Sequence, residues 1–595
     1  MFHHNQHNYG VDIYNQLSQS LSVVDIPMDQ KYVTDSIGQA YKDWKKRHPV
    51  FIEAPTGTRK TTFIYDKIIP YAISKGQHVL LISNRIALSS QQKQRILDLV
   101  RKLAPESITS FPNKIPSKEI RKCTYIGPVC VATYQGLYSL LNTPNEDGRF
   151  PTEWYKRLNY AVFDEIHFLY SDALFNSYCG YLLRKLPVVF KSVIRIYMTA
   201  TSWEIKNAII DSERNMRIAG ASIHLTPMEY FISTKNRFSA EDYPIPPKFL
   251  YYHMDAAFSS YRLHFFGAGA TDIQPICPVA DILDGLEDAL IQKMNPLPSE
   301  LNKWLVFIGD KNKGQVLKKL LEKKCVSVAY IDAKKKDPKR AWTTLISKQI
   351  FEQSVLIATS VIQNGINIVD PNTKNIAVYC IDRTSFIQQL GRKRLHDGET
   401  IDLWVWVPDR GYFSHLEKKM KKHLYIAQNI SSPDRSRYAH GVQTLWNNRE
   451  KLSYNALFYV DNNGTFQVNL YALEVLKRQL SFIEHFTHSS SLWDFRDAVE
   501  EWLGIKSIEP RQSNKTTLPE LETLLHQNTN TPLTEEEFQP IRQAIVYEIL
   551  IRKLEYIRPD RIAKLSATSL NPLLSKLNLR YSVKKSKKIW TISHV

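Results

Sequence analysis

Short apolar runs alternate with amphipathic stretches between residues 31 and 215. This rhythm is typical of a parallel β-sheet covered by helices. We expect a helix over 61–74, in which Pro70 strains the last turn. The expected strands lie at 51–54, 79–82, 129–131, 161–163 and 193–198. Each of them ends directly before a polar segment, and open α/β sheets bind ligands beyond the carboxyl ends of their strands.

The same rhythm returns later in the chain after a break. Residues 216–295 are rich in aromatics and prolines, and we interpret them as a linker or insert with some β structure. Further strands are expected at 304–308, 326–331, 355–358, 376–381 and 403–407. Beyond residue 412 helical patterns dominate, as over 470–486 and 540–556, and 579–590 alternates like a short hairpin.

These patterns predict an α/β protein with two parallel-sheet lobes and a mainly helical C-terminal region. At 595 residues the chain is too long for one hydrophobic core, and 43% apolar residues is normal for a globular protein. The predicted segments are an N-terminal extension (1–30), the first lobe (31–215), the linker (216–295), the second lobe (296–412) and a helical accessory region (413–595).

The charge balance points to a polyanionic partner. The formal net charge is +19 and the sequence pI is about 9.3. A soluble protein this basic usually meets nucleic acid, although a lysine-rich surface without a partner gives the same balance. Basic clusters lie at 334–340, 418–422 and 584–588, and the last of these is flanked by Tyr581 and Trp590. Basic residues beside aromatics suit a strand groove, and the last cluster could also form the wing of a DNA-binding helical module.

The cysteines and the N-terminus indicate the compartment. None of the six cysteines forms a C-x-x-C pair, so neither a zinc site nor a disulfide framework is suggested. Scattered cysteines fit a reducing cytoplasm. The N-terminus lacks the apolar core of a signal peptide, and no stretch is apolar enough to span a membrane. We therefore expect a cytoplasmic protein without a membrane partner, and the oligomeric state stays open.

The segment 54–61 (Ala-Pro-Thr-Gly-Thr-Arg-Lys-Thr) follows the first expected strand. A phosphate loop surrounds a β-phosphate with backbone N–H groups while a lysine neutralises its charge. Lys60 would reach the β- and γ-phosphates, and Thr61 would hold magnesium. Ala54 and Arg59 stand where the strict pattern has glycine, and a side chain at a positive φ costs about 1 kcal/mol or more. Alone, the segment also reads as an ordinary strand-to-helix turn.

A pair of carboxylates, Asp164 and Glu165, follows the buried run at 161–163. Asp164 would bind magnesium, and Glu165 would orient or deprotonate the attacking water. His167 would contact the second lobe or the segment around Thr199 and transmit the state of the phosphate.

Taken in order, these segments resemble the motifs of superfamily 2 helicases. Residues 164–167 (Asp-Glu-Ile-His) resemble the DExH form of motif II, 54–61 motif I, 199–201 motif III and 388–394 motif VI. The resemblance covers residues 30 to 410 and implies two RecA-like lobes of the P-loop NTPase fold. The chain looks most similar to bacterial DEAD/DEAH-box helicases of the type carried on mobile elements.

The resemblance also implies roles for further residues. Arg392, preceded by Gln388, would face the γ-phosphate as an arginine finger. The last family arginine falls at Leu395, so Arg394, one position earlier, is the expected substitute. The remaining residues that it places near the nucleotide are Thr56, Gly57, Thr58, Arg59, Gly365 and Asn367. It also implies that some residues contact the backbone of the nucleic-acid strand. These are Asn84, Arg85, Thr133, Tyr134, Gln135, Thr359 and Ser360.

The sequence therefore predicts an ATP- and Mg²⁺-dependent helicase or translocase, with DNA favoured over RNA as its partner. Two alternatives remain open. One is a nucleic-acid-binding module whose ATPase has weakened, which Arg59 and Leu395 favour. The other is an RNA helicase, because RNA helicases share the DExH motif set. The role of the C-terminal region is not predicted.

Overall fold

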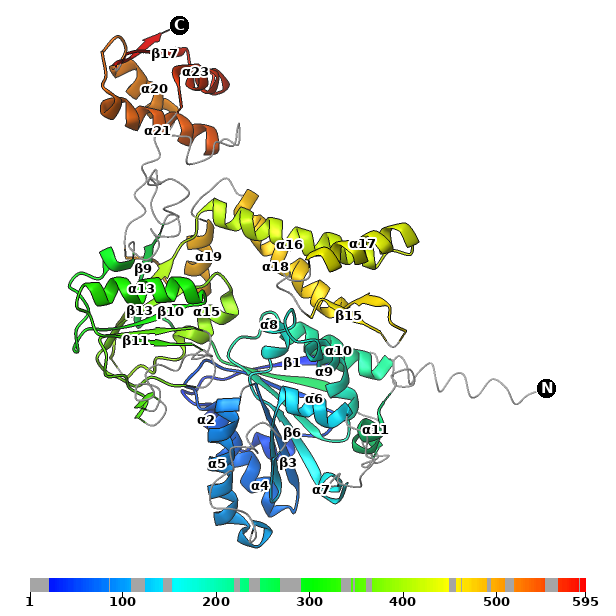
Figure 1. Cartoon of the computed structure of the whole chain (residues 1–595). Coiled ribbons are helices and arrows are strands. Elements are labelled where there is room, and N and C mark those ends of the chain that lie inside the picture. The colour runs from blue at the N-terminus through cyan, green and yellow to red at the C-terminus, as the bar shows by residue number, and fades with distance from the viewer. Residues whose placement is uncertain are drawn as a thin grey trace.

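The computed structural model describes most of the chain. The described residues are 21–84, 86–108, 124–142, 152–218, 225–234, 247–267, 290–332, 344–345, 348–359, 366–396, 398–448, 456–461, 463–488, 494–508, 518–551, 565–587 and 589–594. Figure 1 shows the first lobe below, the second lobe at upper left, long helices at upper right and a small module at the top.

The first lobe is built on an eight-stranded sheet in the order β1-β8-β2-β7-β6-β3-β5-β4. Its strands are β1 (Ser22–Pro27), β2 (Val50–Glu53), β3 (His78–Ser83), β4 (Thr124–Ile126), β5 (Val129–Thr133), β6 (Leu158–Phe163), β7 (Ile194–Thr199) and β8 (Lys248–His253). All neighbouring pairs are parallel except β4 with β5. The strands expected in this lobe from the apolar runs are confirmed.

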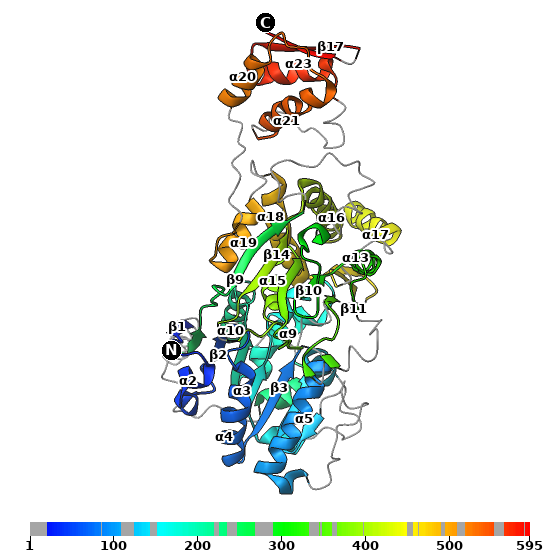
Figure 2. The same cartoon turned by 90° about the vertical axis from the view of Figure 1, so that its left-hand side faces the viewer.

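Helices cover both faces of this sheet (Figures 1 and 2). Successive strand residues point to opposite faces. Val79 and Leu81 of β3 therefore join one core with the helices between residues 60 and 103, whereas Leu80 and Ile82 join another with the helices at 134–142 and 178–189. The helices are α2 (Val33–Ile37), η1 (Ala40–Asp43), α3 (Lys60–Phe63), η2 (Ile64–Ile68), α4 (Ile69–Ser74), α5 (Ile86–Leu103), η3 (Pro105–Ile108), α6 (Tyr134–Asn142), α7 (Thr152–Lys156), α8 (Phe168–Ser171), α9 (Tyr178–Val189), α10 (Lys206–Ile218) and α11 (Pro227–Thr234).

The helix expected over 61–74 forms, but it contains a π turn. The chain runs from α3 through the π-helical η2 into α4, and Pro70 occupies the first turn of α4. Proline has no N–H to give to the preceding turn of an α-helix. A wider turn before the proline accommodates that missing donor, so the strain lies in the middle of the helix rather than in its last turn.

The second lobe is a six-stranded, fully parallel sheet in the order β11-β12-β10-β13-β14-β9. Its strands are β9 (Tyr261–Phe266), β10 (Lys303–Ile308), β11 (Val328–Ile331), β12 (Val355–Ala358), β13 (Thr373–Tyr379) and β14 (Ile401–Trp406), and its described helices are α13 (Lys311–Lys323) and α15 (Arg383–Leu390). Residues of β10 are buried along the whole strand, which explains its uninterrupted apolar sequence.

The β structure expected within 216–295 is present, but its two strands belong to the sheets of the lobes and not to a linker. β8 lies between β1 and β2 in the first sheet, and β9 pairs with β14 at the edge of the second. The predicted 1–30 extension likewise includes β1, a strand of the first sheet. The aromatic residues of 248–266 thus belong to the cores of both lobes, and the crossing between lobes lies between β8 and β9.

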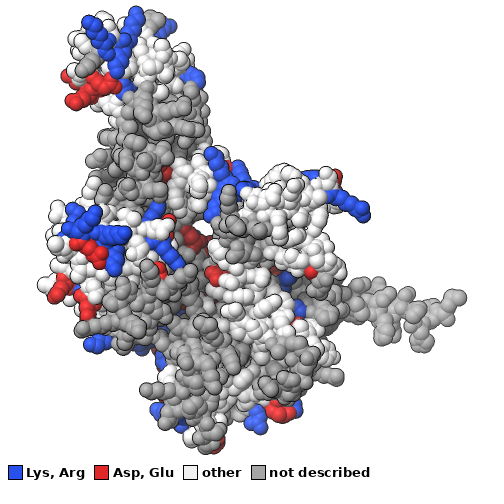
Figure 3. Space-filling model, in the orientation of Figure 1, with Lys and Arg blue, Asp and Glu red and all other residues white. Residues whose placement is uncertain are grey.

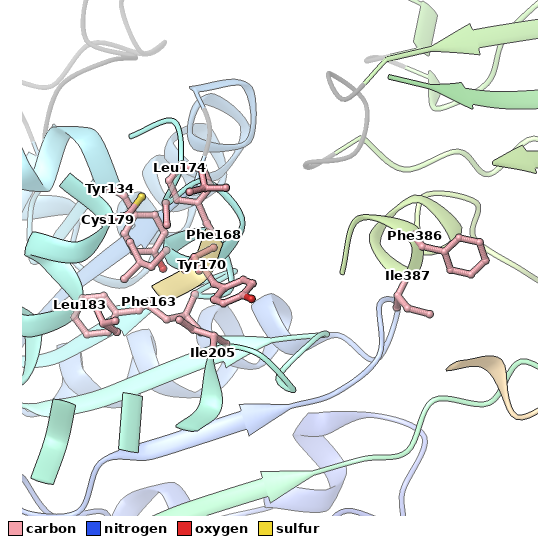
Figure 4. Packing of buried hydrophobic residues seen from close by; sticks show 14 of the residues in the cluster. Tyr134, Phe163, Phe168, Tyr170, Leu174, Cys179, Leu183, Ile205, Phe386 and Ile387 are labelled. Carbon is pink, nitrogen blue, oxygen red and sulfur yellow. The ribbon is translucent and has the colours of Figure 1, made fainter. Parts of the chain in front are cut away.

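The long C-terminal helices bridge the lobes. They are α16 (Arg410–Ile430), α17 (Arg435–Asn448), α18 (Leu470–His488) and α19 (Asp494–Leu503), with the hairpin β15 (Phe458–Val460) and β16 (Phe466–Val468). One hydrophobic cluster runs through Leu174 of the first lobe, Phe386 of the second and Val475 of α18. Figure 4 shows part of it, with Ile387 beside Phe386 on α15. These helices therefore brace the two lobes.

The last described elements form a separate module with its own core. They are α20 (Leu518–Gln527), α21 (Glu535–Ile551), α23 (Ala567–Lys576) and the antiparallel hairpin of β17 (Tyr581–Ser586) and β18 (Ile589–His594). The expected hairpin is confirmed. The module stands apart from both lobes (Figures 1 and 2). Within the residues that the structure describes, every helix is too short or too polar to cross a membrane.

Candidate active site

The phosphate-loop segment connects the end of β2 to the start of α3 at Lys60. Arg59 has φ 62° and ψ 33°, the left-handed conformation in which a side chain carries the expected cost. Its guanidinium lies 4.0 Å from the centre of the Tyr32 ring. The left-handed backbone costs about 1–2 kcal/mol, and an exposed cation–π contact returns about 0.5–1 kcal/mol. Tyr32 therefore offsets part of the cost of this arginine.

Lys60 is buried, with 8% of its surface exposed. Its Nζ donates to the carbonyl oxygens of Ala54 at 2.5 Å and Pro55 at 3.1 Å. Burial lowers the pKa of Lys60 to about 8, although Glu165 and Asp164 act in the opposite direction. The ammonium group is thus held over the loop by two neutral acceptors, and it would gain more from an anion than it gains from them.

Asp164 and Glu165 follow β6 and face this loop. Thr61 Oγ1 donates to Asp164 Oδ2 at 3.2 Å. Burial, together with the charge of Glu165, raises the pKa of Asp164 to about 7. Burial would also raise the pKa of Glu165, but His167, Lys60 and Arg392 hold it below its usual value. Two adjacent carboxyls with pKa values moved in opposite directions are typical of a division of chemical roles.

His167 connects Glu165 to the end of β7. Its Nδ1 lies 3.0 Å from Thr199 Oγ1 and 3.4 Å from Glu165 Oε2. Thr199 Oγ1 in turn donates to the carbonyl of Thr201 and accepts from its N–H, both at 3.0 Å. The expected contact of His167 with the segment around Thr199 is therefore present.

The second lobe brings two arginines to the same place. Arg392 lies 3.9 Å from Glu165 Oε1, and its Nη2 donates to Gln388 Oε1 at 2.9 Å. Arg394 Nε donates to Asn367 Oδ1 at 3.0 Å. Burial, followed by the charge of Arg392, lowers the pKa of Arg394 to about 10. The second lobe thus places two guanidinium groups, one buried and one partly buried, beside the cleft, and guanidinium groups bind phosphate well.

Residues of both lobes line one cleft of about 470 Å³. Across it, a Cβ placed on Gly57 would lie 3.1 Å from Arg394 Nη1, and one placed on Gly391 would lie 2.0 Å from Thr56 Oγ1. The lobes are therefore closed on each other. The residues that line the cleft are Thr56, Gly57, Arg59, Lys60, Thr61, Thr62, Tyr65, Gln92, Arg95, Asp164, Glu165, Gln349, Asn367, Arg392 and Arg394.

The donor set of this cleft fits a magnesium nucleotide. Thr61 and Asp164 offer one hydroxyl and one carboxylate, and magnesium takes few protein ligands beside phosphates and water. Within the described residues, His, Cys, Asp and Glu side chains nowhere form a group of three or more that could hold a metal by itself. The buried Oε2 of Glu165 lies beside His167 and accepts no hydrogen bond from the described residues.

A second contact between the lobes was not expected from the sequence. The guanidinium of Arg383 lies 4.1 Å from the Trp203 ring, and Trp203 Nε1 donates to Thr384 Oγ1 at 3.2 Å. Thr384 also donates to Glu204. Gln92, which donates to Asp164 Oδ2 at 3.4 Å, was missed as well. No local pattern marks these residues, because their partners are far away in the sequence.

Most of the residues predicted to contact a nucleic-acid strand are buried. Tyr134 has no exposed surface, and its hydroxyl donates to the carbonyl of Asp164 at 3.0 Å. Its inclusion among the strand contacts is therefore wrong, and it supports the Asp164 turn instead. Asn84, Thr133 and Thr359 are each at most 7% exposed, whereas Gln135 is exposed. Arg85, Ser360 and Gly365 lie outside the described residues.

Thr58 is also buried, and it closes the phosphate-loop turn. Its hydroxyl donates to the carbonyl of Pro55 at 2.7 Å, and its own carbonyl accepts from the N–H of Val33 at 3.0 Å. Thr58 thus ties the loop to α2 and does not line the cleft, whereas the other described residues expected near the nucleotide do.

Comparisons with known structures give distant similarities. S. cerevisiae Dbp5 bound to RNA and ADP BeF3 is 15% identical over 63% of this chain and 83% of its own, with a TM-score of 0.37. The helicase MrfA bound to DNA is 14% identical over 76% and 66%, with a TM-score of 0.40. A CRISPR-associated protein is 13% identical over 96% and 70%, with a TM-score of 0.44. No curated protein sequence matches the chain.

Two family models match the lobes that form the cleft. The model described as type III restriction enzyme, res subunit, matches residues 24–203. The model described as helicase conserved C-terminal domain matches residues 287–394. The first match contains the phosphate loop and the paired carboxylates, and the second ends at Arg394. The two lobes are thus similar, in this order along the chain, to the motor domains of superfamily 2 helicases and related ATP-dependent nucleic-acid enzymes.

Proposed function

We propose that the chain is a DExH-type helicase or translocase that hydrolyses ATP with Mg²⁺ in the inter-lobe cleft and moves along a nucleic acid strand, DNA being the favoured substrate. One observation carries this proposal. Lys60 and the carboxylates of the first lobe share a cleft with Arg392 and Arg394 of the second. Groups that distant in the sequence meet only when the lobes close, so ATP binding is coupled to a relative movement.

The first lobe would bind the phosphates and prepare the attacking water. Lys60 neutralises the β- and γ-phosphates and exchanges its two carbonyl acceptors for charged oxygens. Thr61 and Asp164 hold magnesium, which supplies charge neutralisation and keeps Asp164 ionised. Glu165, whose pKa is lowered, is ionised at neutral pH and orients the attacking water.

The second lobe would complete the site. Arg392 is oriented by Gln388 and lies near Glu165, so it faces the position of the terminal phosphate. A finger of this kind contributes about 10³–10⁵ in rate. Arg394, held by Asn367, would place a second positive charge beside the loop. His167 would transmit phosphate release to Thr199, and from there to Trp203 and its partners in the second lobe.

The strand would run along the carboxyl edge of the sheets, where Gln135 is exposed. Asn84, Thr133 and Thr359 flank this edge at the ends of β3, β5 and β12, and Arg85 and Ser360 remain proposed contacts. Contacts to phosphates position a strand without reading its sequence. Opening and closing of the lobes would move these groups along the backbone.

The test is ATP turnover across matched single-stranded and duplex DNA and RNA. Wild-type protein is expected to turn over ATP, with the largest stimulation by single-stranded DNA. Glu165→Gln is expected to bind ATP but to lose turnover, because it retains the shape of the side chain and removes the ionisable carboxylate. Equal turnover in this variant would refute the assigned role of Glu165, and stimulation by RNA alone would replace DNA as the substrate.

A second candidate is a nucleic-acid-binding module with weak turnover, which the left-handed Arg59 favours. Strand binding without any stimulated turnover would favour this alternative.

A further inference from the structure

The C-terminal module, residues 518–551, 565–587 and 589–594, is held together by its own hydrophobic core. Phe538, Leu574 and Trp590 belong to a cluster that is separate from those of the lobes. No residue of this module lines the cleft or belongs to the helicase motifs. Any function of the module therefore depends on its own surface.

The hairpin is fixed rigidly to the helices of the module. The rings of Trp590 and Phe538 stack at 4.2 Å with an interplanar angle of 5°. Trp590 Nε1 donates to Glu535 Oε2 at 2.7 Å. Asn571 on α23 accepts from Val583 N at 2.7 Å and donates to Val583 O at 3.1 Å. The hairpin is thus held against α21 and α23 by a ring stack and by hydrogen bonds.

The aromatics of the hairpin do not reach this surface. Trp590 is 1% exposed and Tyr581 is 7% exposed, so neither can stack on a base. The expectation that aromatics beside the lysines form a strand groove is therefore wrong. These rings are core residues that support the hairpin from behind.

The charge of this surface has a single sign. From residue 565 to 595 the sequence contains six Lys and Arg residues and no Asp or Glu. Lys585 is paired with Glu535 of α21 at 2.6 Å. Arg580, Lys584 and Lys587 are exposed, and none of them has an ion pair with a described carboxylate. Figure 3 shows the blue side chains gathered at the outer end of the module, with the acidic ones together to one side.

Hydroxyl groups are exposed along α23. Thr568, Ser569 and Ser575 are exposed on this helix. Hydroxyl, lysine and arginine side chains are the groups that contact phosphate oxygens in nucleic-acid complexes. A single strand is usually held by bases stacked on aromatic rings, and no Phe, Tyr or Trp side chain is exposed on α23 or on the described part of the hairpin.

We propose that α23 and the β17–β18 hairpin form a docking surface for the phosphate backbone of duplex nucleic acid. Three unpaired cations on a rigid frame match a polyanion whose phosphates are also rigidly spaced. Recognition of this kind is independent of sequence. The inference rests on the proposed function, because the motor is what makes nucleic acid the relevant polyanion, and it assigns a duplex contact to a part of the chain outside the motor.

The test uses the full chain and a fluorescent duplex whose binding is followed by anisotropy over a series of salt concentrations. The variant Arg580→Ala/Lys584→Ala/Lys587→Ala removes the three unpaired charges. It is expected to bind the duplex about tenfold or more weakly at low salt, and the slope of log K against log salt should fall by about 2 to 3. Two duplexes of unrelated sequence should lose the same factor.

The control variant is Lys319→Ala/Lys323→Ala/Lys324→Ala, which removes the same charge from exposed positions on and just after α13. It should bind the duplex as the wild type does. Lys584→Arg/Lys587→Arg should also retain binding, because it keeps the charge and the fold. ATP turnover stimulated by a single strand should stay within about twofold in all of these variants, since the motor contacts are unchanged.

Unchanged duplex affinity and salt slope in the triple alanine variant would overturn the proposal. So would a variant that binds the duplex normally but loses binding to vesicles containing phosphatidylserine, which would make the surface a membrane contact. Failure of the proposed function has a different signature. In that case no nucleic acid stimulates ATP turnover, while duplex affinity is still measured directly by anisotropy.

Discussion

Replacing Gly391 by alanine is expected to obstruct closure of the cleft. A Cβ at this position would lie 2.0 Å from Oγ1, 2.5 Å from Cγ2 and 2.6 Å from Cβ of Thr56 on the opposite lobe. Ordinary van der Waals contact begins at 3.4 Å. The loops must therefore separate by about 1 Å, and a displacement of about 1 Å at a reacting centre costs about 10²-fold in rate. ATP turnover should fall by about that factor.

The assay is steady-state ATP hydrolysis with saturating single-stranded nucleic acid, together with ATP binding measured separately. Thr56→Gly/Gly391→Ala should recover part of the lost rate, because the second glycine removes all three clashing atoms. Gly411→Ala, where the added Cβ meets Asp409 only at 3.4 Å, should behave as the wild type. Wild-type turnover in Gly391→Ala, or no recovery in the double variant relative to Thr56→Gly alone, would refute the closed geometry.

Three further predictions concern other parts of the structure. Burial and Asp382 raise the pKa of Glu204 to about 7, so its stabilising contribution is present below pH 4.5 and is lost as pH rises through about 7. In Glu204→Gln this fall in stability should be absent, which is checked by measuring the melting temperature as a function of pH. Glu213→Ala leaves buried Arg195 without its partner and should cost about 3–5 kcal/mol in urea unfolding. Arg59→Gly should strengthen ATP binding severalfold in titrations, whereas Arg59→Ala, which keeps the strain, should weaken it.

The lobes and the cleft could be predicted because their signals are local. Strands of a parallel sheet are buried on both faces, so β5 and β10 appear as apolar runs of strand length. The polar residues that follow those runs meet at one edge of the sheet. The cost of a side chain at position 59 was predictable from the loop pattern, and the structure shows that φ is indeed positive there.

The pairing of β8 and β9 could not be predicted from local patterns. β8 is only half-buried along its length. Its residue Leu250 pairs with Val50 of β2, which lies far away in the sequence. Such a strand resembles an aromatic linker until its neighbours are known. The contacts of Trp203 with the start of α15 are hidden in the same way, because each partner alone looks like an ordinary surface residue.

Tyr134 shows a different limit of the sequence. A tyrosine directly after a strand end has the position expected of a strand contact, yet the fold buries its ring and uses its hydroxyl to hold the Asp164 turn. Trp590 was assigned to a nucleic-acid groove for a similar reason and instead forms the core of the hairpin. Aromatic residues with a polar atom can contact a nucleic acid or pack in a core, and only their burial in the fold distinguishes the two roles.

The measurement that bears most directly on the two-lobed site is ATP turnover by Arg392→Ala in the presence of single-stranded nucleic acid. Turnover is expected to fall by about 10³-fold or more, while ATP affinity changes by less than about tenfold, because Arg392 would act on the transition state from the opposite lobe. A variant that hydrolyses ATP within tenfold of the wild-type rate would contradict the account.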